Sequence, residues 1–95
     1  MKTVKTKSQR RDYMQKKAAM LKQMVDIGDS VFSYVAKYKD TNMEQAILDI
    51  YYGRPYHTPL NQCVFPGTNE IDWDKAEMNL SIMRNKLATI RELCK

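Results

Sequence analysis

The segment from residue 73 to residue 94 has the most regular apolar pattern in the sequence. Its apolar residues are separated by alternating steps of three and four positions: Trp73, Ala76, Leu80, Met83, Leu87, Ile90 and Cys94. This spacing is typical of a helix that packs along its whole length against other helices. A strand would need alternation with period two, and a membrane-spanning helix would need about 18 consecutive apolar residues. The pattern therefore predicts an all-α fold and no membrane partner.

A second long amphipathic segment covers residues 8–38. On a helical wheel with 100° per residue, one broad face carries Met14, Ala18, Leu21, Met24, Val25, Val31, Phe32, Val35 and Tyr38. The pattern keeps its phase through Gly28, so we expect one continuous helix, with a break at residues 26–29 as the alternative. Such a broad face indicates two neighbours, either both within the chain or one in a second subunit.

A short helix is predicted for residues 42–52. Thr41 and Glu44 have the spacing of a capping box, in which each side chain binds a free backbone N–H at the helix start. Gly53 stands where a left-handed residue commonly ends a helix. We expect these two signals to define the ends of the short helix.

The segment 54–69 contains all 3 prolines and is predicted to be a loop that packs on the helices through its apolar residues. Asp72 follows as the N-cap of the terminal helix, which we expect to cover residues 72–94. Residues 1–7 are predicted to be a disordered basic tail. Residues 8–95 are predicted to be a single helical domain, in which the two long helices form an antiparallel hairpin.

The charge is unevenly distributed along the chain. The net charge of the chain is +5. Lys and Arg are concentrated in the first 23 residues, whereas acidic residues outnumber basic ones in residues 40–77. A basic arm is suited to phosphate contacts without base reading, and to RNA more than DNA; the alternative is a solvated surface that favours solubility. The candidate nucleic-acid-binding residues are Lys5, Lys7, Arg10, Arg11, Lys16, Lys17 and Lys22.

Aromatic and basic residues cluster after the short helix. The candidate partner-binding residues are Tyr52, Arg54, Tyr56 and His57, which follow Tyr51. Tyrosine and arginine are enriched at protein–protein hot spots, and the same combination can stack on a base and bind a phosphate. A purely structural role, with Tyr51 in the core, is the third interpretation.

Enzyme signatures are absent from the sequence. His57 is the single histidine, the 3 glycines are scattered, and no phosphate-binding loop occurs, so we expect neither catalysis, nor a metal, nor a cofactor. Cys63 and Cys94 lie far apart, as expected for two reduced thiols in an intracellular protein. Because no apolar segment follows the basic start, we expect a cytoplasmic protein without a secretory signal.

These observations favour a non-enzymatic regulator or adaptor that acts by occupying a protein partner. We expect it to form a homo-oligomer through its broad apolar helix faces. The alternative is an accessory protein that binds RNA or DNA through the basic arm and the loop at residues 54–57. In its small size and its richness in methionine and lysine, the chain resembles the accessory proteins of large bacterial viruses, although no motif carries this likeness.

Overall fold

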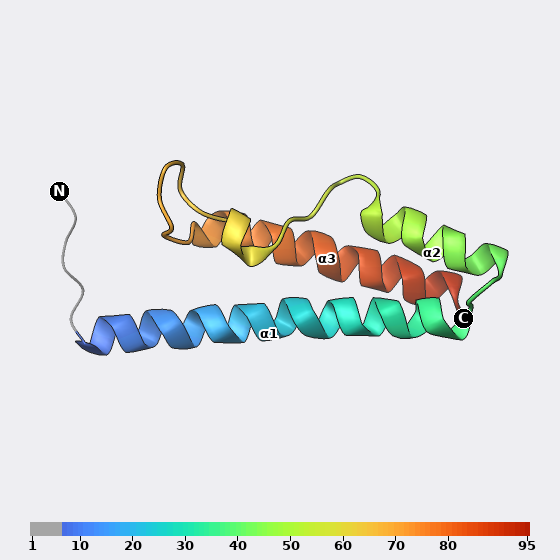
Figure 1. The fold of residues 1–95 in the computed structure, drawn as a ribbon, viewed down its shortest axis with the longest axis horizontal. Helices are drawn as coiled ribbons and strands as arrows, with labels where there is room; N and C mark the ends of the chain where they lie inside the picture. Colours follow the sequence, from blue (N-terminus) through green and yellow to red (C-terminus); the bar gives the residue numbers. More distant parts are fainter. Residues whose placement is uncertain (1–6) are drawn as a thin grey trace.

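The computed structural model describes residues 7–95, and its secondary structure is almost entirely helical. The elements in chain order are α1 (Lys7–Lys37), α2 (Asn42–Tyr52), the 3₁₀ helix η1 (Leu60–Gln62) and α3 (Trp73–Leu93) (Figure 1). The all-α prediction is therefore confirmed, and no helix in this range is long and apolar enough to span a bilayer. The tail predicted for residues 1–7 lies outside the described part except for Lys7, where α1 begins.

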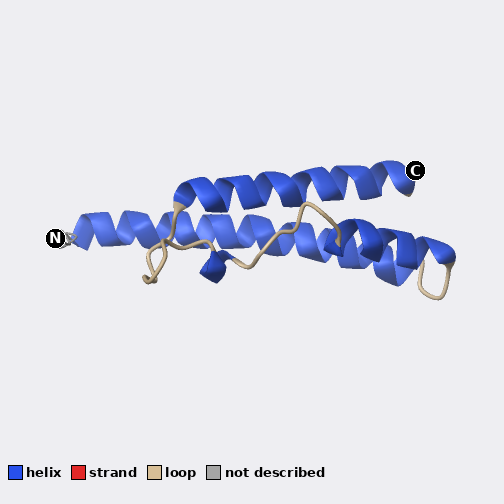
Figure 2. Ribbon diagram, turned by 90° about the horizontal axis from the view of Figure 1, so that it is seen from above, coloured by secondary structure: helices blue, strands red, loops and turns tan. Residues whose placement is uncertain are grey.

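The two long helices lie side by side, but they are parallel, so the predicted antiparallel hairpin is wrong (Figures 1 and 2). At their N-terminal ends the ring of Tyr13 packs edge-on against Trp73, with 5.8 Å between centroids. At their C-terminal ends the hydroxyl of Tyr38 donates to the carbonyl oxygen of Cys94 over 3.4 Å. The reason is the return path: α2 and the connection at residues 53–72 together lead back along α1, so α3 starts beside Tyr13 in the N-terminal part of α1.

The apolar face of α3 packs as its spacing predicts. Buried positions follow one another along the helix: Ala76, Leu80, Met83, Leu87 and Ile90. Trp73 and Cys94, at the two ends of the pattern, pack against this core while remaining partly exposed. The predicted N-cap is also confirmed, because the carboxylate of Asp72 accepts hydrogen bonds from the backbone N–H groups of Asp74 and Lys75.

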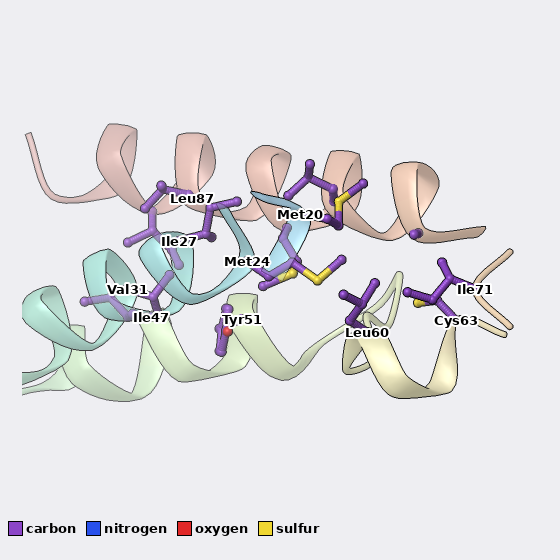
Figure 3. Packing of buried hydrophobic residues seen from close by; sticks show 14 residues of the cluster. Met20, Met24, Ile27, Val31, Ile47, Tyr51, Leu60, Cys63, Ile71 and Leu87 are labelled. Carbon is purple, nitrogen blue, oxygen red and sulfur yellow. The ribbon is translucent and has the colours of Figure 1, made fainter. Parts of the chain in front are cut away.

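The helix α1 is continuous through Gly28, as predicted. A Cβ atom at this position would lie 3.4 Å from the hydroxyl oxygen of Tyr51. The group that approaches the glycine is therefore a side chain from α2, and not another backbone. Figure 3 shows how residues of α1, α2, η1 and α3 meet in one core, with Tyr51 beneath Met24 and Ile27.

Only part of the apolar face predicted for α1 is buried. Of its members, Met24 and Val31 are buried, together with Met20 and Ile27, which the wheel did not include. A second stripe, about 100° away around the helix, is exposed: Met14, Leu21, Val25 and Phe32. The wheel merged these two stripes into one face, because α1 has more apolar side chains than α2 and α3 together cover.

Both ends of α2 differ in detail from the prediction. The hydroxyl of Thr41 donates back to the Tyr38 carbonyl, and the Glu44 carboxylate accepts from the backbone N–H of Asp40 over 2.6 Å, so no capping box forms. Gly53 has an ordinary φ of −85° and is not left-handed. A glycine is needed there because a Cβ would lie 2.4 Å from a backbone carbonyl oxygen of the last turn.

Candidate functional site

A groove with a volume of about 600 Å³ runs between α1 and the segment that leads from the end of α2 to η1. Its two walls are formed mainly by Leu21, Val25 and Phe32 on α1 and by Tyr52, Tyr56 and His57 on the opposite side. The two apolar walls are open to solvent: Phe32 is 44 % exposed, Tyr52 59 % and Tyr56 64 %. Large apolar side chains gathered in one exposed groove are typical of a binding site.

Tyr51 fixes the position of the aromatic side chains in the groove. Its own ring is buried and meets three other rings, with centroid distances of 5.7 Å to Phe32, 5.1 Å to Tyr52 and 4.6 Å to His57. Such contacts contribute about 0.5–1.5 kcal/mol each beyond the area that they bury. Three of the rings that line the groove are therefore already held against Tyr51 in the free protein.

The buried side chain of Lys86 on α3 holds the end of α2. Its Nζ atom donates to the carbonyl oxygens of Tyr51 and Gly53, over 2.8 and 2.9 Å, and to Nδ1 of His57 over 3.0 Å. The last carbonyls of a helix have no partner within the helix, so the ammonium group serves as their cap. Its three protons are all used. We therefore assign Lys86 a structural role, and not that of a free nucleophile.

The same contacts determine the charges of the groove. Burial lowers the pKa of His57, and the neighbouring Lys86 ammonium lowers it further. Because an ammonium group can only donate, Nδ1 of His57 accepts and the imidazole is neutral, with its proton on Nε2. Burial also lowers the pKa of Lys86. The pKa of Tyr51 is raised by burial and by the nearby Tyr52, so its hydroxyl stays protonated.

The loop side of the groove is held by Asn79, a buried residue of α3. Its Oδ1 accepts from the backbone N–H of Thr58, and its Nδ2 donates to the carbonyl oxygen of the same residue, both over 2.7 Å. One side chain thus satisfies both backbone groups of a loop residue, as a neighbouring strand would. The position of Tyr56 and His57, directly before Thr58, is tied in this way to α3.

The structure brings together three of the four predicted partner-binding residues. Tyr52, Tyr56 and His57 line the groove. Arg54 does not: its Nε donates to the Tyr56 hydroxyl over 3.4 Å, and its guanidinium lies 5.9 Å from the centre of that ring. Arg54 therefore supports the outer wall from the solvent side.

The predicted nucleic-acid-binding residues do not form one surface. Lys5 and the side chain of Lys7 lie outside the described part of the chain. The others are spread around α1, where Lys16 places its Nζ 4.4 Å from the centre of the Trp73 ring and Lys22 pairs with Asp26 over 3.0 Å. The remaining members of the set are at least partly accessible: Arg10, Arg11 and Lys17.

Sequence reasoning missed the α1 wall and the two buried polar side chains that position the loop. Leu21, Val25 and Phe32 were placed on one broad face together with Met24 and Val31, although α1 contains two separate series with steps of three and four that could have shown a second face. Asn79 and Lys86 act on residues far away in the sequence, and no local pattern indicates such contacts.

Comparison of the chain with known protein families, with curated proteins and with solved structures found no significant match.

Proposed function

We propose that this protein is a non-enzymatic binding protein that holds an apolar helical segment of a protein partner in the groove. The observation that carries this proposal is the exposure of large apolar side chains on both walls of a groove whose shape is fixed beforehand. A rigid groove loses little conformational entropy when it is occupied, which favours affinity. Its aromatic side chains are the residue types that dominate protein–protein hot spots.

The shape of the α1 wall favours a helix as the occupant. Leu21, Val25, Gly28 and Phe32 lie along one side of α1 over about 16 Å, which corresponds to three turns of a helix. An amphipathic helix with apolar residues at positions i, i+3 or i+4 and i+7 would place one side chain against each turn. The neutral His57 adds no charge to the opposite wall, which suits an apolar segment.

Nucleic acid is the second candidate, and one contact favours it. The guanidinium of Arg54 lies beside the exposed ring of Tyr56, an arrangement that could stack on an unpaired base and bind its phosphate. The two candidates differ in their response to salt. Binding to nucleic acid weakens steeply as salt rises because counterions are released, whereas a desolvated apolar interface is much less sensitive.

A selection of displayed amphipathic helical peptides against the full chain tests the proposal. We expect the selected peptides to share apolar residues at helical spacing and to bind almost equally at low and high salt. The variant Tyr52→Ala should weaken their binding about tenfold or more, as expected for a hot-spot aromatic residue.

The matched control is Met78→Ala, because Met78 is 68 % exposed and lies on α3 outside the groove. It should bind the peptides as the unchanged protein does. Peptides that bind equally well to the Tyr52→Ala variant would contradict the proposal. Binding of single-stranded RNA that is lost at high salt and depends on Arg54 would support the second candidate instead.

A further inference from the structure

We propose that the groove is occupied by α1 of a second copy of this chain, in an antiparallel dimer with two-fold symmetry. This inference rests on the proposed function, because it requires that the groove binds a helix. Three features of the described residues identify that helix as α1: the spacing of its exposed stripe, the size of the side chains in the stripe and the charges beside it.

The exposed stripe of α1 has the spacing of a helix–helix seam. Its positions follow steps of four and three: Met14, Ala18, Leu21, Val25, Gly28 and Phe32. This is an a/d heptad pattern that is separate from the buried series, and it extends along α1 beyond the groove toward Met14. A stripe with heptad spacing points to another helix with the same spacing, and α1 itself carries the matching pattern.

The side chains of the stripe complement one another when two copies of α1 are antiparallel. A two-fold axis midway between residues 26 and 27 places Leu21 opposite Phe32 of the second copy, and Val25 opposite its Gly28. Each contact then occurs twice, as two-fold symmetry requires. The partner's Val25 would lie beside the Tyr51 hydroxyl, which approaches Gly28 from α2, and the centre of the seam coincides with the centre of the α1 wall.

The charges beside the stripe distinguish the two possible orientations. Lys22 and Asp29 both flank the exposed stripe on the side opposite to the buried stripe, where Asp29 also lines the groove, and both are exposed. In the antiparallel pair, Lys22 of one copy, which also pairs with Asp26 of its own helix over 3.0 Å, comes close to Asp29 of the other copy, twice. In a parallel pair, Lys17 would instead face Lys22 of the partner at the g and e positions of the heptads. Like charges there are unfavourable, so the sequence of α1 favours the antiparallel pair.

Sedimentation equilibrium on the full chain measures the expected dimer. Phe32→Lys should shift the protein to the monomer mass, with an unchanged far-ultraviolet circular dichroism spectrum because Phe32 is already partly exposed. Met78→Lys introduces the same charge at an exposed apolar residue outside the groove and should leave the dimer unchanged. A dimer that survives Phe32→Lys would overturn the inference.

A charge swap tests the pairing of Lys22 with Asp29. The single change Asp29→Lys replaces two attractive pairs by two repulsive pairs and should raise the dissociation constant about tenfold. The double variant Lys22→Asp with Asp29→Lys should restore the original affinity. If the double variant dimerises no better than the single one, the proposed register is wrong.

The orientation of the two α1 helices can be measured as the distance between spin labels on the two copies of Cys94, the more accessible of the two thiols. Cys63 is buried and can be replaced by alanine, which leaves Cys94 for a spin label. Cys94 lies next to Tyr38, and in the antiparallel register the two copies of Tyr38 are about 35 Å apart along the dimer. A label distance near this value supports the inference, whereas a parallel pair would bring the two labels together and would overturn it.

The oligomeric state and the peptide selection fail in distinguishable ways, although a peptide that enters the groove competes with the second copy. A chain that stays monomeric at all concentrations, yet binds selected peptides in the groove, would overturn the dimer and leave the proposed function standing. A chain that is monomeric and binds no peptide would overturn both.

Discussion

The two long helices differ in how much of their apolar surface the chain covers. The single apolar face of α3 lies against both α1 and α2, and its central positions from Ala76 to Ile90 are buried. On α1, the stripe around Ile27 is buried in the same core, but the stripe that includes Phe32 faces solvent. Two faces with the same heptad spacing thus have different roles, because a heptad pattern shows that a face can pack and does not show which helix packs against it.

The largest expected effect contrasts Leu87 of α3 with Phe32 of α1. Leu87→Asp should lower the free energy of unfolding by about 3–5 kcal/mol, because the charge would be buried without a partner. Phe32→Asp should lower it by about 1 kcal/mol or less, since the ring is 44 % exposed. Urea unfolding at low protein concentration, where self-association contributes least, measures both. Equal losses would show that the stripe of α1 belongs to the core.

A smaller effect is expected when the charge inside the covered face of α3 is removed. Lys86→Met should lower the free energy of unfolding by about 2–3 kcal/mol, because the carbonyl oxygens of Tyr51 and Gly53 lose a charged donor. Lys75→Met, at an exposed position of the same helix, is the control and should have little effect. An unchanged stability in Lys86→Met would mean that water satisfies the end of α2 equally well.

The smallest expected effect is a pH dependence that arises from His57. Burial and Lys86 lower its pKa in the folded state below the ordinary value of about 6.5. As the pH falls below 6.5, the unfolded chain therefore binds a proton that the folded chain does not, and stability decreases. The free energy of unfolding, measured from about pH 7.5 to about pH 5.5 on either side of the ordinary histidine pKa, should decrease as the pH falls. His57→Gln should make this pH dependence weaker. An unchanged pH dependence in the variant would assign it to other groups.

The sequence was sufficient for features that depend on neighbouring residues. The apolar steps from Trp73 to Cys94 and the carboxylate of Asp72 define α3 locally, and both behave as predicted. The direction of α3 relative to α1 was not predictable in this way, because it depends on how far α2 and the following connection lead back. The conformation of Gly53 was missed for a similar reason: its requirement for glycine comes from a close carbonyl oxygen and not from a positive φ.

Part of the candidate site was predictable because its residues are neighbours in the sequence. Tyr52, Tyr56 and His57 follow one another closely at a helix end, and aromatic residues in such a place indicate a contact surface. The opposite wall was not predicted, because a wheel counts apolar residues without counting the helices available to cover them. Lys86 and His57 meet across 29 positions of sequence, so their contact appears only in three dimensions.

The parallel arrangement of α1 and α3 has a consequence for the order in which the chain folds. The turn between α1 and α2 is short, whereas Tyr13 and Ile71 meet across 58 positions, and closing so long a loop is entropically costly and slow. We therefore expect the first two helices to associate before α3 docks. On the ribosome they also emerge before α3, so the buried stripe of α1 stays only partly covered until α3 has been synthesised.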